Sequence, residues 1–271
     1  MRLAVRAPAT TANLGAGFDC AALALDLWNE VVVTDEGTRD RTHLGVRAFE
    51  RIGPADGLGF EFYDRIPRER GLGSSAAVIA LGLVAGAHVA GREPDPEWLL
   101  HEGLQLEGHA DNLAAALAGG ACLTSDGRIH RVADDVPGVP IALVPEAAVA
   151  TAEARAALPE RVPLGDAVFT VGRAALLGAG LASGSETVFA AGLDDRVHEP
   201  YRAPNAPLLA DVRAEPPTGA LGATISGSGP TVIVWVHPHK AKECSVELSN
   251  RFPDVEVLWL STSPKGAGLS E

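Results

Sequence analysis

A glycine- and serine-rich octapeptide followed by a long apolar run is the feature that most constrains this fold. Residues 70–77 read RGLGSSAA, and the apolar run SSAAVIALGLVAGAHVAG begins at Ser74 and stops at Gly91. The run predicts a buried helix, and residues 60–66 before the glycines are typical of a strand. A strand, a glycine loop and a helix in that order direct backbone N–H groups of the first helical turn toward one spot. These donors and the helix dipole favour an anion there.

Two interpretations of this octapeptide stay open from its own residues. Its glycines let the backbone approach phosphate oxygens closely, and the hydroxyls of Ser74 and Ser75 can serve phosphate or Mg²⁺. A glycine turn that merely leads into a packed helix explains the same residues equally well. The Lys-Ser/Thr ending of a P-loop and a G-x-G-x-x-G after the first strand are both missing, so neither common nucleotide fingerprint applies.

Length, charge and cysteine usage limit the class of protein. The 271 residues, 46% of them hydrophobic, can form one large core or two small ones. A net charge of −13 disfavours nucleic acid and anionic membranes as partners, although a few local cations can still bind an anionic substrate. The three cysteines have no C-x-x-C spacing, and the N-terminus lacks the apolar core of a signal peptide. We therefore expect a cytoplasmic protein with no nucleic-acid or membrane partner.

Hydrophobic patterning and breaker residues predict an α+β fold, because strands and helices do not alternate regularly. Strands are expected at 2–6, 31–34, 60–66, 121–124, 128–132, 141–144, 231–236 and 255–260. Helices are expected at 74–91, 96–107, 112–118, 152–157, 165–182, 186–191 and 238–250. The composition changes at DDVPGVP, which predicts an N-terminal domain over 1–136 and a C-terminal domain over 137–271.

Three further segments match one protein family in the order of its motifs. They read APATTANLGAGFDCAALAL (7–25), LEGHADNLAAALAGG (106–120) and TISGSGPTVIVWV (224–236). Together with P-x-x-x-GLGSSAA (67–77) they resemble the GHMP kinases, the superfamily of galactokinase, homoserine kinase, mevalonate kinase and phosphomevalonate kinase. Within it they are most similar to the homoserine kinases. The resemblance implies an N-terminal domain like domain 2 of ribosomal protein S5 and a ferredoxin-like C-terminal domain, with ATP and the acceptor between them.

The resemblance also implies that the octapeptide is a phosphate loop for ATP. The residues that it assigns to ATP are Pro67, Arg70, Gly71, Leu72, Gly73, Ser74, Ser75, Ala76 and Ala77. Mg²⁺ would be held by the Ser74 or Ser75 hydroxyl and by a carboxylate that such kinases carry shortly before their H-x-D-N motif. Glu107 is the first choice for this carboxylate and Glu102 the second, because family members differ in loop length here.

For catalysis the resemblance points to Asn112, together with Glu107 and Ser75. Asn112 would contact the acceptor hydroxyl. Because an amide is a poor base, we expect direct attack by a well-placed hydroxyl, with Mg²⁺ and backbone donors stabilising the developing charge. Asp111 is expected to cap the helix that begins near Asn112.

The acceptor implied is L-homoserine, a zwitterion whose carboxylate needs a cation. Arginine suits this group because its planar fork meets a carboxylate bidentately. The segment TAEARAALPE resembles the family's T-x-E-A-R-x-x-L-P and makes Arg155 one candidate, with Thr151 beside it. The segment HEPYRAP (198–204) resembles the family's second arginine segment and makes Arg202 another.

The ammonium of homoserine would pair with Asp19, and Asn13 would help to hold the acceptor. Gly227, in SGSG, would let a second loop approach acceptor and triphosphate. The expected reaction gives O-phospho-L-homoserine and ADP, a step of threonine biosynthesis. The rivals are another small-alcohol kinase of the superfamily and an inactive member that binds a metabolite or a protein partner. Homodimerisation is common among such kinases, so we also expect a homodimer. Trp28 and Asn29 are candidates for the adenine side, where residues 36–60 are shortened.

Overall fold

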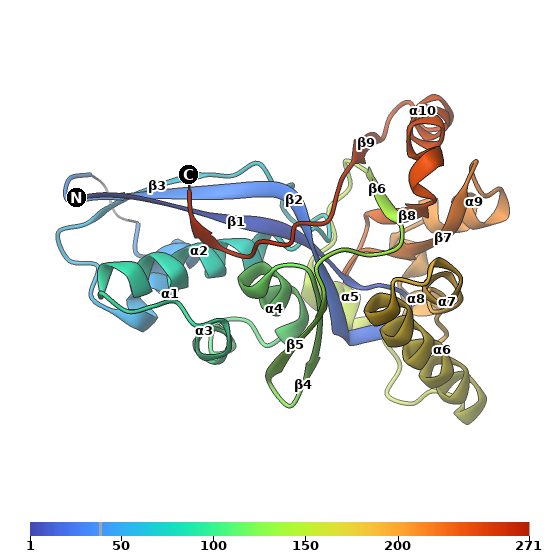
Figure 1. Cartoon of the computed structure of the whole chain (residues 1–271), viewed down its shortest axis with the longest axis horizontal. Coiled ribbons are helices and arrows are strands. Elements are labelled where there is room, and N and C mark those ends of the chain that lie inside the picture. Colours follow the sequence, from blue (N-terminus) through green and yellow to red (C-terminus); the bar gives the residue numbers. More distant parts are fainter. Residues whose placement is uncertain (38–39, 271) are drawn as a thin grey trace.

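The computed structural model describes residues 1–37 and 40–270, and it confirms a two-domain α+β fold (Figure 1). The first sheet has the order β10-β1-β2-β4-β5, with β3 paired to β2, and all of its pairs are antiparallel. Its strands are β1 (Arg2–Asn13), β2 (Gly17–Thr34), β3 (Gly59–Tyr63), β4 (Ala121–Ser125), β5 (Arg128–Ala133) and β10 (Gly268–Leu269).

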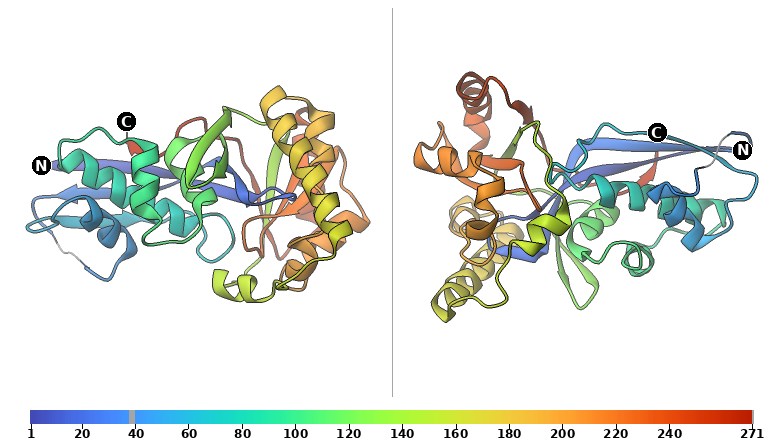
Figure 2. Two further views of the ribbon diagram at one scale, coloured as in Figure 1. Left: turned by 90° about the horizontal axis from the view of Figure 1, so that it is seen from below. Right: turned by 180° about the vertical axis from the view of Figure 1, so that it is seen from behind.

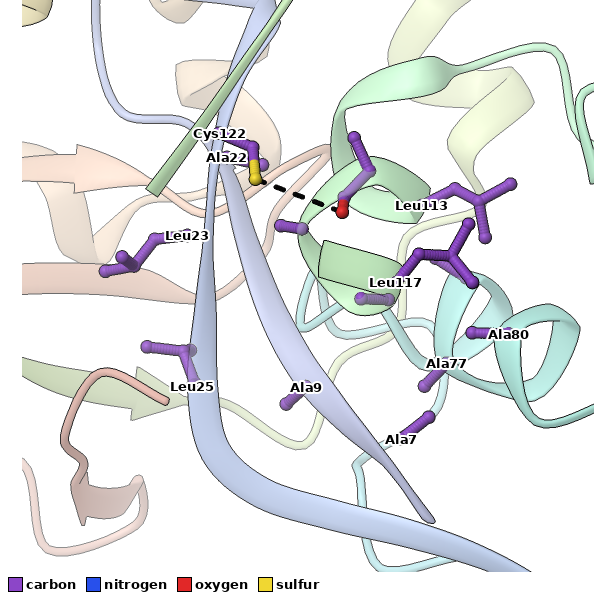
Figure 3. Packing of buried hydrophobic residues seen from close by; sticks show 14 of the residues in the cluster. Ala7, Ala9, Ala22, Leu23, Leu25, Ala77, Ala80, Leu113, Leu117 and Cys122 are labelled. Atoms are coloured by element: carbon purple, nitrogen blue, oxygen red, sulfur yellow. Dashed lines mark hydrogen bonds between the residues drawn. The ribbon is translucent and has the colours of Figure 1, made fainter. Parts of the chain in front are cut away.

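Four helices pack on the first sheet: α1 (Leu44–Ile52), α2 (Ser74–Val89), α3 (Pro96–Gly103) and α4 (Ala110–Ala118). Small side chains on the strands let these helices approach closely, as Ala7 and Ala9 do beside Ala77 and Ala80 (Figure 3). The thiol of Cys122 lies 3.9 Å from the carbonyl oxygen of Ala114, and burial raises its pKa to about 12. All three cysteines are free thiols.

The second sheet has the order β7-β8-β6-β9 and is antiparallel. Its strands are β6 (Val139–Val144), β7 (Ala220–Ile225), β8 (Val232–Val236) and β9 (Glu256–Trp259). With α9 (Leu208–Ala214) and α10 (Ala241–Arg251) they follow the β-α-β-β-α-β order of ferredoxin-like domains.

Further helices lie between β6 and α9: α5 (Thr151–Ala156), α6 (Leu164–Ser183), α7 (Glu186–Ala191), α8 (Glu199–Arg202) and the 3₁₀ turn η1 (Ala203–Asn205). A second 3₁₀ turn, η2 (Pro238–Lys240), precedes α10. The sheet is covered on both faces, which explains why β8 is apolar throughout. Val232 and Val234 belong to the cluster under α9 and α10, whereas Ile233 and Trp235 belong to the cluster that includes α6 and α7.

Helix α6 lies on the surface of the second domain and crosses its near face in the left view of Figure 2. It is the one helix in the described ranges that is long and apolar enough to cross a membrane, and a single helix of this kind is weak evidence of a span. Figure 2 also shows that the chain returns to the first domain after β9. There the Ser263 N–H donates to the carbonyl of Ala24, and β10 pairs with β1. The division at 136/137 stays a prediction.

Several predicted boundaries were wrong. β1 and β2 run far beyond 2–6 and 31–34, because their middle residues are small and buried on both sides and show no alternation. The helix predicted at 96–107 ends at Gly103, and the strand predicted at 60–66 ends at Tyr63. Helices α1 and α9 and strand β7 were not predicted.

Candidate active site

The glycine loop packs directly against the end of β1 and against the loop after β7. Gly73 has φ +66°, and a Cβ there would lie 1.8 Å from Oγ1 of Thr10. A Cβ on Gly71, with φ +81°, would lie 2.2 Å from the carbonyl oxygen of Ser226. The Thr10 N–H donates to the carbonyl of Leu72 at 3.1 Å. Because a Cβ at position 71 or 73 would collide with these neighbours, only glycine fits at either position.

The same loop leaves the start of α2 open on its other side. Gly73 is the N-cap and offers no side-chain acceptor, and the first intrahelical bond runs from the Ala77 N–H to the carbonyl of Gly73. The N–H groups of residues 74–76 therefore have no partner within the helix. They face a hollow of about 730 Å³, open mouth included, where the helix dipole favours an anion.

This hollow brings together most of the predicted site residues. From the phosphate loop it is lined by Gly71, Gly73, Ser74, Ser75 and Ala76. All seven residues predicted to bind the acceptor also line it: Asn13, Asp19, Asn112, Thr151, Arg155, Arg202 and Gly227. They come from sequence positions up to 214 residues apart, as the contact between Asn13 and Gly227 illustrates. Four more lining residues were not predicted to be there: Glu69, His109, Asp111 and Ser228.

Four residues assigned to ATP lie elsewhere. The side chains of Leu72 and Ala77 are fully buried in the core of the first domain. Pro67 and Arg70 line a separate hollow with Val144–Glu146 and Pro253–Glu256. The sequence could not separate these residues, because a motif fixes the order of residues and not the direction in which each side chain points.

Glu107 lies in the hollow and Glu102 does not. Ser75 hydrogen-bonds to the Glu107 carboxylate, but burial has the larger effect and raises its pKa. One carboxylate oxygen, Oε2, is buried without a hydrogen-bond partner among the described residues. The Glu102 carboxylate instead accepts from Arg51 of α1, with Oε2 2.6 Å from Nη2. A carboxylate beside a serine hydroxyl offers the oxygen ligands that Mg²⁺ prefers, completed by substrate phosphates.

Helix α4 places Asn112 at the wall of the hollow. Its Oδ1 accepts a hydrogen bond from the Thr10 hydroxyl at 2.7 Å. Asp111 was predicted to be the cap of this helix, and that prediction was wrong: the helix begins at Ala110, and His109 is the N-cap. The Asp111 carboxylate instead accepts from the Asn112 N–H at 2.7 Å. Asp111 is nearly fully buried, which raises its pKa.

The acceptor residues form a hydrogen-bonded arc between the two domains. Asn13, with φ +73°, donates from Nδ2 to the carbonyl of Gly227 at 2.8 Å and accepts from the Asp19 N–H at 3.0 Å. Arg202 donates from Nη1 to the same carbonyl at 3.1 Å. Arg155 and Asp19 pair with each other through two hydrogen bonds of 2.7 and 2.9 Å.

Arg202 is a buried cation with one donor that is unused among the described residues. Its side chain is 3% exposed, its guanidinium lies 5.1 Å from the centre of the Phe18 ring, and burial lowers its pKa. Its Nε is buried and has no hydrogen-bond partner within the described part of the chain. A buried charge with unmet donors is costly unless an anion completes it. Position and chemistry together favour a carboxylate ligand.

A buried polar cluster behind Arg202 was missed by the sequence reasoning. One oxygen of Asp195 accepts from the N–H groups of Val197, His198 and Glu199 at 2.7–3.0 Å, and so holds the start of α8. Nε2 of His198 lies 2.8 Å from the carbonyl of Gly15, and its ring stacks on Phe18. The cluster ties α8 to the turn between β1 and β2. The available signal was local: Asp195 accepts from N–H groups two to four residues ahead, as an aspartate at a helix start does, whereas the contact of His198 with Gly15 depends on the fold.

The adenine candidates have different surroundings. Asn29 is buried, and its Oδ1 accepts hydrogen bonds from the N–H groups of Arg65 and Ile66. It therefore fixes the segment that leads into the glycine loop. Trp28 donates to Asp26 and lies under the Arg6 guanidinium. Neither lines the hollows beside the loop. A second hollow does adjoin Ser74 and Ser75, and its other lining residues are Asp40, Thr42, His43, Leu44, Arg68, Glu69 and Val78.

Comparison with known proteins agrees with this geometry. The family models for the N-terminal and C-terminal domains of GHMP kinases match residues 42–120 and 167–254. Fold and site together define a GHMP kinase. A homoserine kinase of Moorella thermoacetica is 38% identical over 262 residues, 88% of each chain, and one of Gloeobacter violaceus is 38% identical over 292 residues, 97% of each chain. The chain therefore belongs to the homoserine kinase family.

Solved structures give the same fold. A homoserine kinase from Cytophaga hutchinsonii superimposes with a TM-score of 0.85 at 24% identity, over 99% of this chain and 97% of that one. A structure from Listeria monocytogenes described as a putative homoserine kinase has a TM-score of 0.79 at 27% identity, over 99% of both chains. Phosphomevalonate kinase of Streptococcus pneumoniae shares only the fold, with a TM-score of 0.72 at 15% identity over 97% of this chain and 99% of that one.

Proposed function

We propose that this protein transfers the γ-phosphoryl group of ATP to the side-chain hydroxyl of L-homoserine and forms O-phospho-L-homoserine and ADP. The observation that carries the proposal is the juxtaposition, in one hollow, of the open start of α2 with Asp19, Arg155 and Arg202. The helix start suits the triphosphate, and the three charged side chains suit a zwitterion. Relatives named homoserine kinases over most of their length support this choice.

In this mechanism the chain's own residues position the reactants. The N–H groups of residues 74–76 would hold the phosphates and stabilise the charge that develops on them. The Asn112 amide, whose Oδ1 accepts from Thr10 and whose Nδ2 donates to Asp111 at 3.4 Å, would orient the acceptor hydroxyl for direct attack on the γ-phosphorus. Arg202 would hold the acceptor carboxylate. Such positioning accounts for most of the catalysis in phosphoryl transfer, where little covalent chemistry is left to the protein.

Magnesium belongs to the same proposal. Glu107 and the hydroxyl of Ser75 would hold the ion beside the phosphates, with the Ser74 hydroxyl close by, and the ion would neutralise the charge of the triphosphate. The unpartnered Oε2 of Glu107 supports this role. Because Glu107 must lose its proton to bind the metal and burial raises its pKa, the apparent Mg²⁺ affinity should increase with pH.

We place the adenine in the second hollow, on the far side of Ser74 and Ser75 from the acceptor. The His43 ring lies against Phe62, tilted by 31°, with 3.9 Å between centroids. Its Nδ1 accepts a hydrogen bond from the Gly45 N–H at 3.2 Å, so among the described residues Nε2 is left for a base. Replacement of His43 by Ala should raise the KM for ATP several-fold and leave the KM for homoserine unchanged. Asn29→Ala would instead lower stability.

We also propose a cytoplasmic homodimer. Helix α6 exposes Leu164, Val168, Val171 and Leu176, which are 80%, 63%, 69% and 38% accessible. An uncharged apolar face on a chain of net charge −13 suits contact with a second copy. Light scattering at micromolar concentration tests it, and a monomeric mass refutes it.

The decisive experiment measures ADP release with MgATP against L-homoserine, D-homoserine, L-serine, mevalonate and galactose. We expect a strong preference for L-homoserine. A preference for mevalonate or a sugar would keep the fold and the phosphate loop but remove the roles of Asp19, Arg155 and Arg202. Folded protein that binds ATP and stays inactive with every alcohol would instead be a metabolite-binding member of the family.

A further inference from the structure

The two charged residues at the mouth of the hollow are already paired with each other. Nη1 and Nη2 of Arg155 donate to the two carboxylate oxygens of Asp19 at 2.7 and 2.9 Å. Such a bidentate pair is the strongest geometry for this kind of contact. Both side chains are 39% exposed, so water reaches them. Each of these residues is therefore engaged before any ligand arrives.

The pair joins two elements that line the hollow, one from each domain. Asp19 stands at the start of β2, with φ +56° and its N–H held by Asn13. Arg155 stands on α5, a six-residue helix of which only Ala154 is buried. The α5 segment has few other ties to the first domain, among them the bond from the Val149 N–H to the carbonyl of Glu69 at 3.1 Å. The ion pair thus closes the space between β2 and α5.

We propose that the zwitterionic acceptor enters by exchange of ion partners, and that this exchange selects for zwitterions. The ammonium of the acceptor replaces Arg155 on Asp19, and its carboxylate replaces Asp19 on Arg155. This inference rests on the proposed function, in which the acceptor is L-homoserine. A zwitterion restores a partner to both residues. A ligand with one charge breaks the pair and leaves the other residue with water alone.

Arg202 explains why the exchange can begin. It is buried, it is not part of the ion pair, and its Nε is unused within the described part of the chain. It offers the carboxylate an anchor before the pair opens. Arg155 then adds a second contact that is available only to a ligand able to satisfy Asp19. The internal pair therefore lowers the affinity for simple cations and for simple carboxylates alike.

Two half-analogues of homoserine separate this exchange from ordinary contact. 3-Aminopropan-1-ol has the hydroxyl and the ammonium without the carboxylate, and 4-hydroxybutanoate has the hydroxyl and the carboxylate without the ammonium. If the pair opposes binding, Arg155→Gln releases Asp19 and tightens the binding of 3-aminopropan-1-ol. In the same way Asp19→Asn releases Arg155 and tightens the binding of 4-hydroxybutanoate. Partly exposed ion pairs of this kind correspond to a change of about twofold to fivefold in Kd.

The dissociation constants are measured by ligand-observed NMR titration on the wild type and on each variant. Arg161→Gln and Glu153→Gln serve as controls, because they remove the same charges close by, from exposed side chains outside the hollow. The controls should shift Kd less than the exchange variants do. Asn at position 19 tolerates the positive φ well, and both exchanged side chains lie at the surface, so both variants should fold.

Unchanged or weaker binding of the half-analogues by the two variants would overturn the exchange. Equal tightening of binding in the control variants would overturn it as well. The absence of detectable binding in every protein at about 100 mM ligand would also overturn it, because even very weak sites fill at that concentration. Wild-type turnover of L-homoserine is measured alongside. Its absence refutes the proposed function, whereas the analogue titrations still decide whether Asp19 and Arg155 compete with a ligand for each other.

Discussion

Replacement of Gly73 by Ala tests how the phosphate loop is held in place. Gly73 has φ +66°, where an L-residue is strained by about 1–2 kcal/mol. The new Cβ would also lie 1.8 Å from Oγ1 of Thr10 and 3.2 Å from Oδ1 of Asn112. Thr10 must then move and lose its hydrogen bond to Asn112, which adds about 1 kcal/mol, and overpacking adds about 1 kcal/mol or more. We expect a total loss of about 3 kcal/mol in the free energy of unfolding.

A matched control separates strain from collision. Gly91 has φ +67°, nearly the same conformation, and nothing lies within 4 Å of a Cβ placed there. Gly91→Ala should therefore cost about 1 kcal/mol, reduced by the lower entropy of the unfolded chain. For a protein of this size, thermal unfolding should fall by roughly 6–12 °C for Gly73→Ala and by roughly 2–4 °C for Gly91→Ala.

The two substitutions should also differ in their effect on kcat. Because Thr10 fixes the Asn112 amide that would orient the acceptor, Gly73→Ala should lower kcat about tenfold or more, whereas Gly91→Ala should leave it unchanged. Differential scanning fluorimetry without nucleotide and a coupled ADP assay measure both effects. Equal destabilisation by the two substitutions would refute the collision with Thr10. Loss of activity without any loss of stability would mean that Gly73 matters for phosphate contact and not for packing.

Three further predictions concern single side chains of the site. Arg202→Met should raise the KM for homoserine about tenfold or more and leave the KM for ATP unchanged, because it removes a buried carboxylate contact; equal effects on both constants would count against this assignment. Glu107→Gln should depress kcat at saturating ATP, and the metal assignment fails if Glu102→Gln, which breaks only the pair with Arg51, does so instead. Burial lowers the pKa of His198 from 6.5 to about 4, so the unfolded chain binds more protons in this range and stability is lost as pH falls through it. His198→Gln, which can still donate to the Gly15 carbonyl, removes this contribution, so between pH of about 6.5 and 4 the unfolding temperature should fall less steeply, or rise more, than in the wild type as pH falls; an identical pH dependence would mean that His198 makes no such contribution.

The sequence predicted elements well where one local signal dominates. Helix α2 begins at Ser74 as expected and ends at Val89, because Gly91 adopts a positive φ just beyond it. The same reasoning failed for β1 and β2, whose central residues are small and buried on both faces, so that they lack the alternation of a half-buried strand. Strand β7 was not predicted, since its extended form depends on pairing with β8.

Membership of the site was more predictable than its contacts. Motif resemblance named all seven acceptor residues that line the hollow. It could not predict that Thr10 holds Asn112, or that Asp19 is paired with Arg155, because these partners are 102 and 136 residues apart. Nor could it reveal Asp195, which acts on backbone N–H groups that any sequence would supply.

The ambiguity of the glycine loop resolves when its two sides are considered separately. A Cβ on Gly71 would collide with Ser226, and a Cβ on Gly73 would collide with Thr10, so close packing alone requires glycine at both positions. The N–H side of the following residues faces the hollow, where an anion is favoured. The packing that requires glycine and the proposed phosphate site therefore use opposite sides of one loop. The Ser226 hydroxyl, 2.7 Å from the Gly71 carbonyl and 2.9 Å from Oγ1 of Thr11, extends this packing across both domains. A substitution in the loop 70–77 should therefore alter the conformation of the loop 226–229, and the reverse, even without substrate.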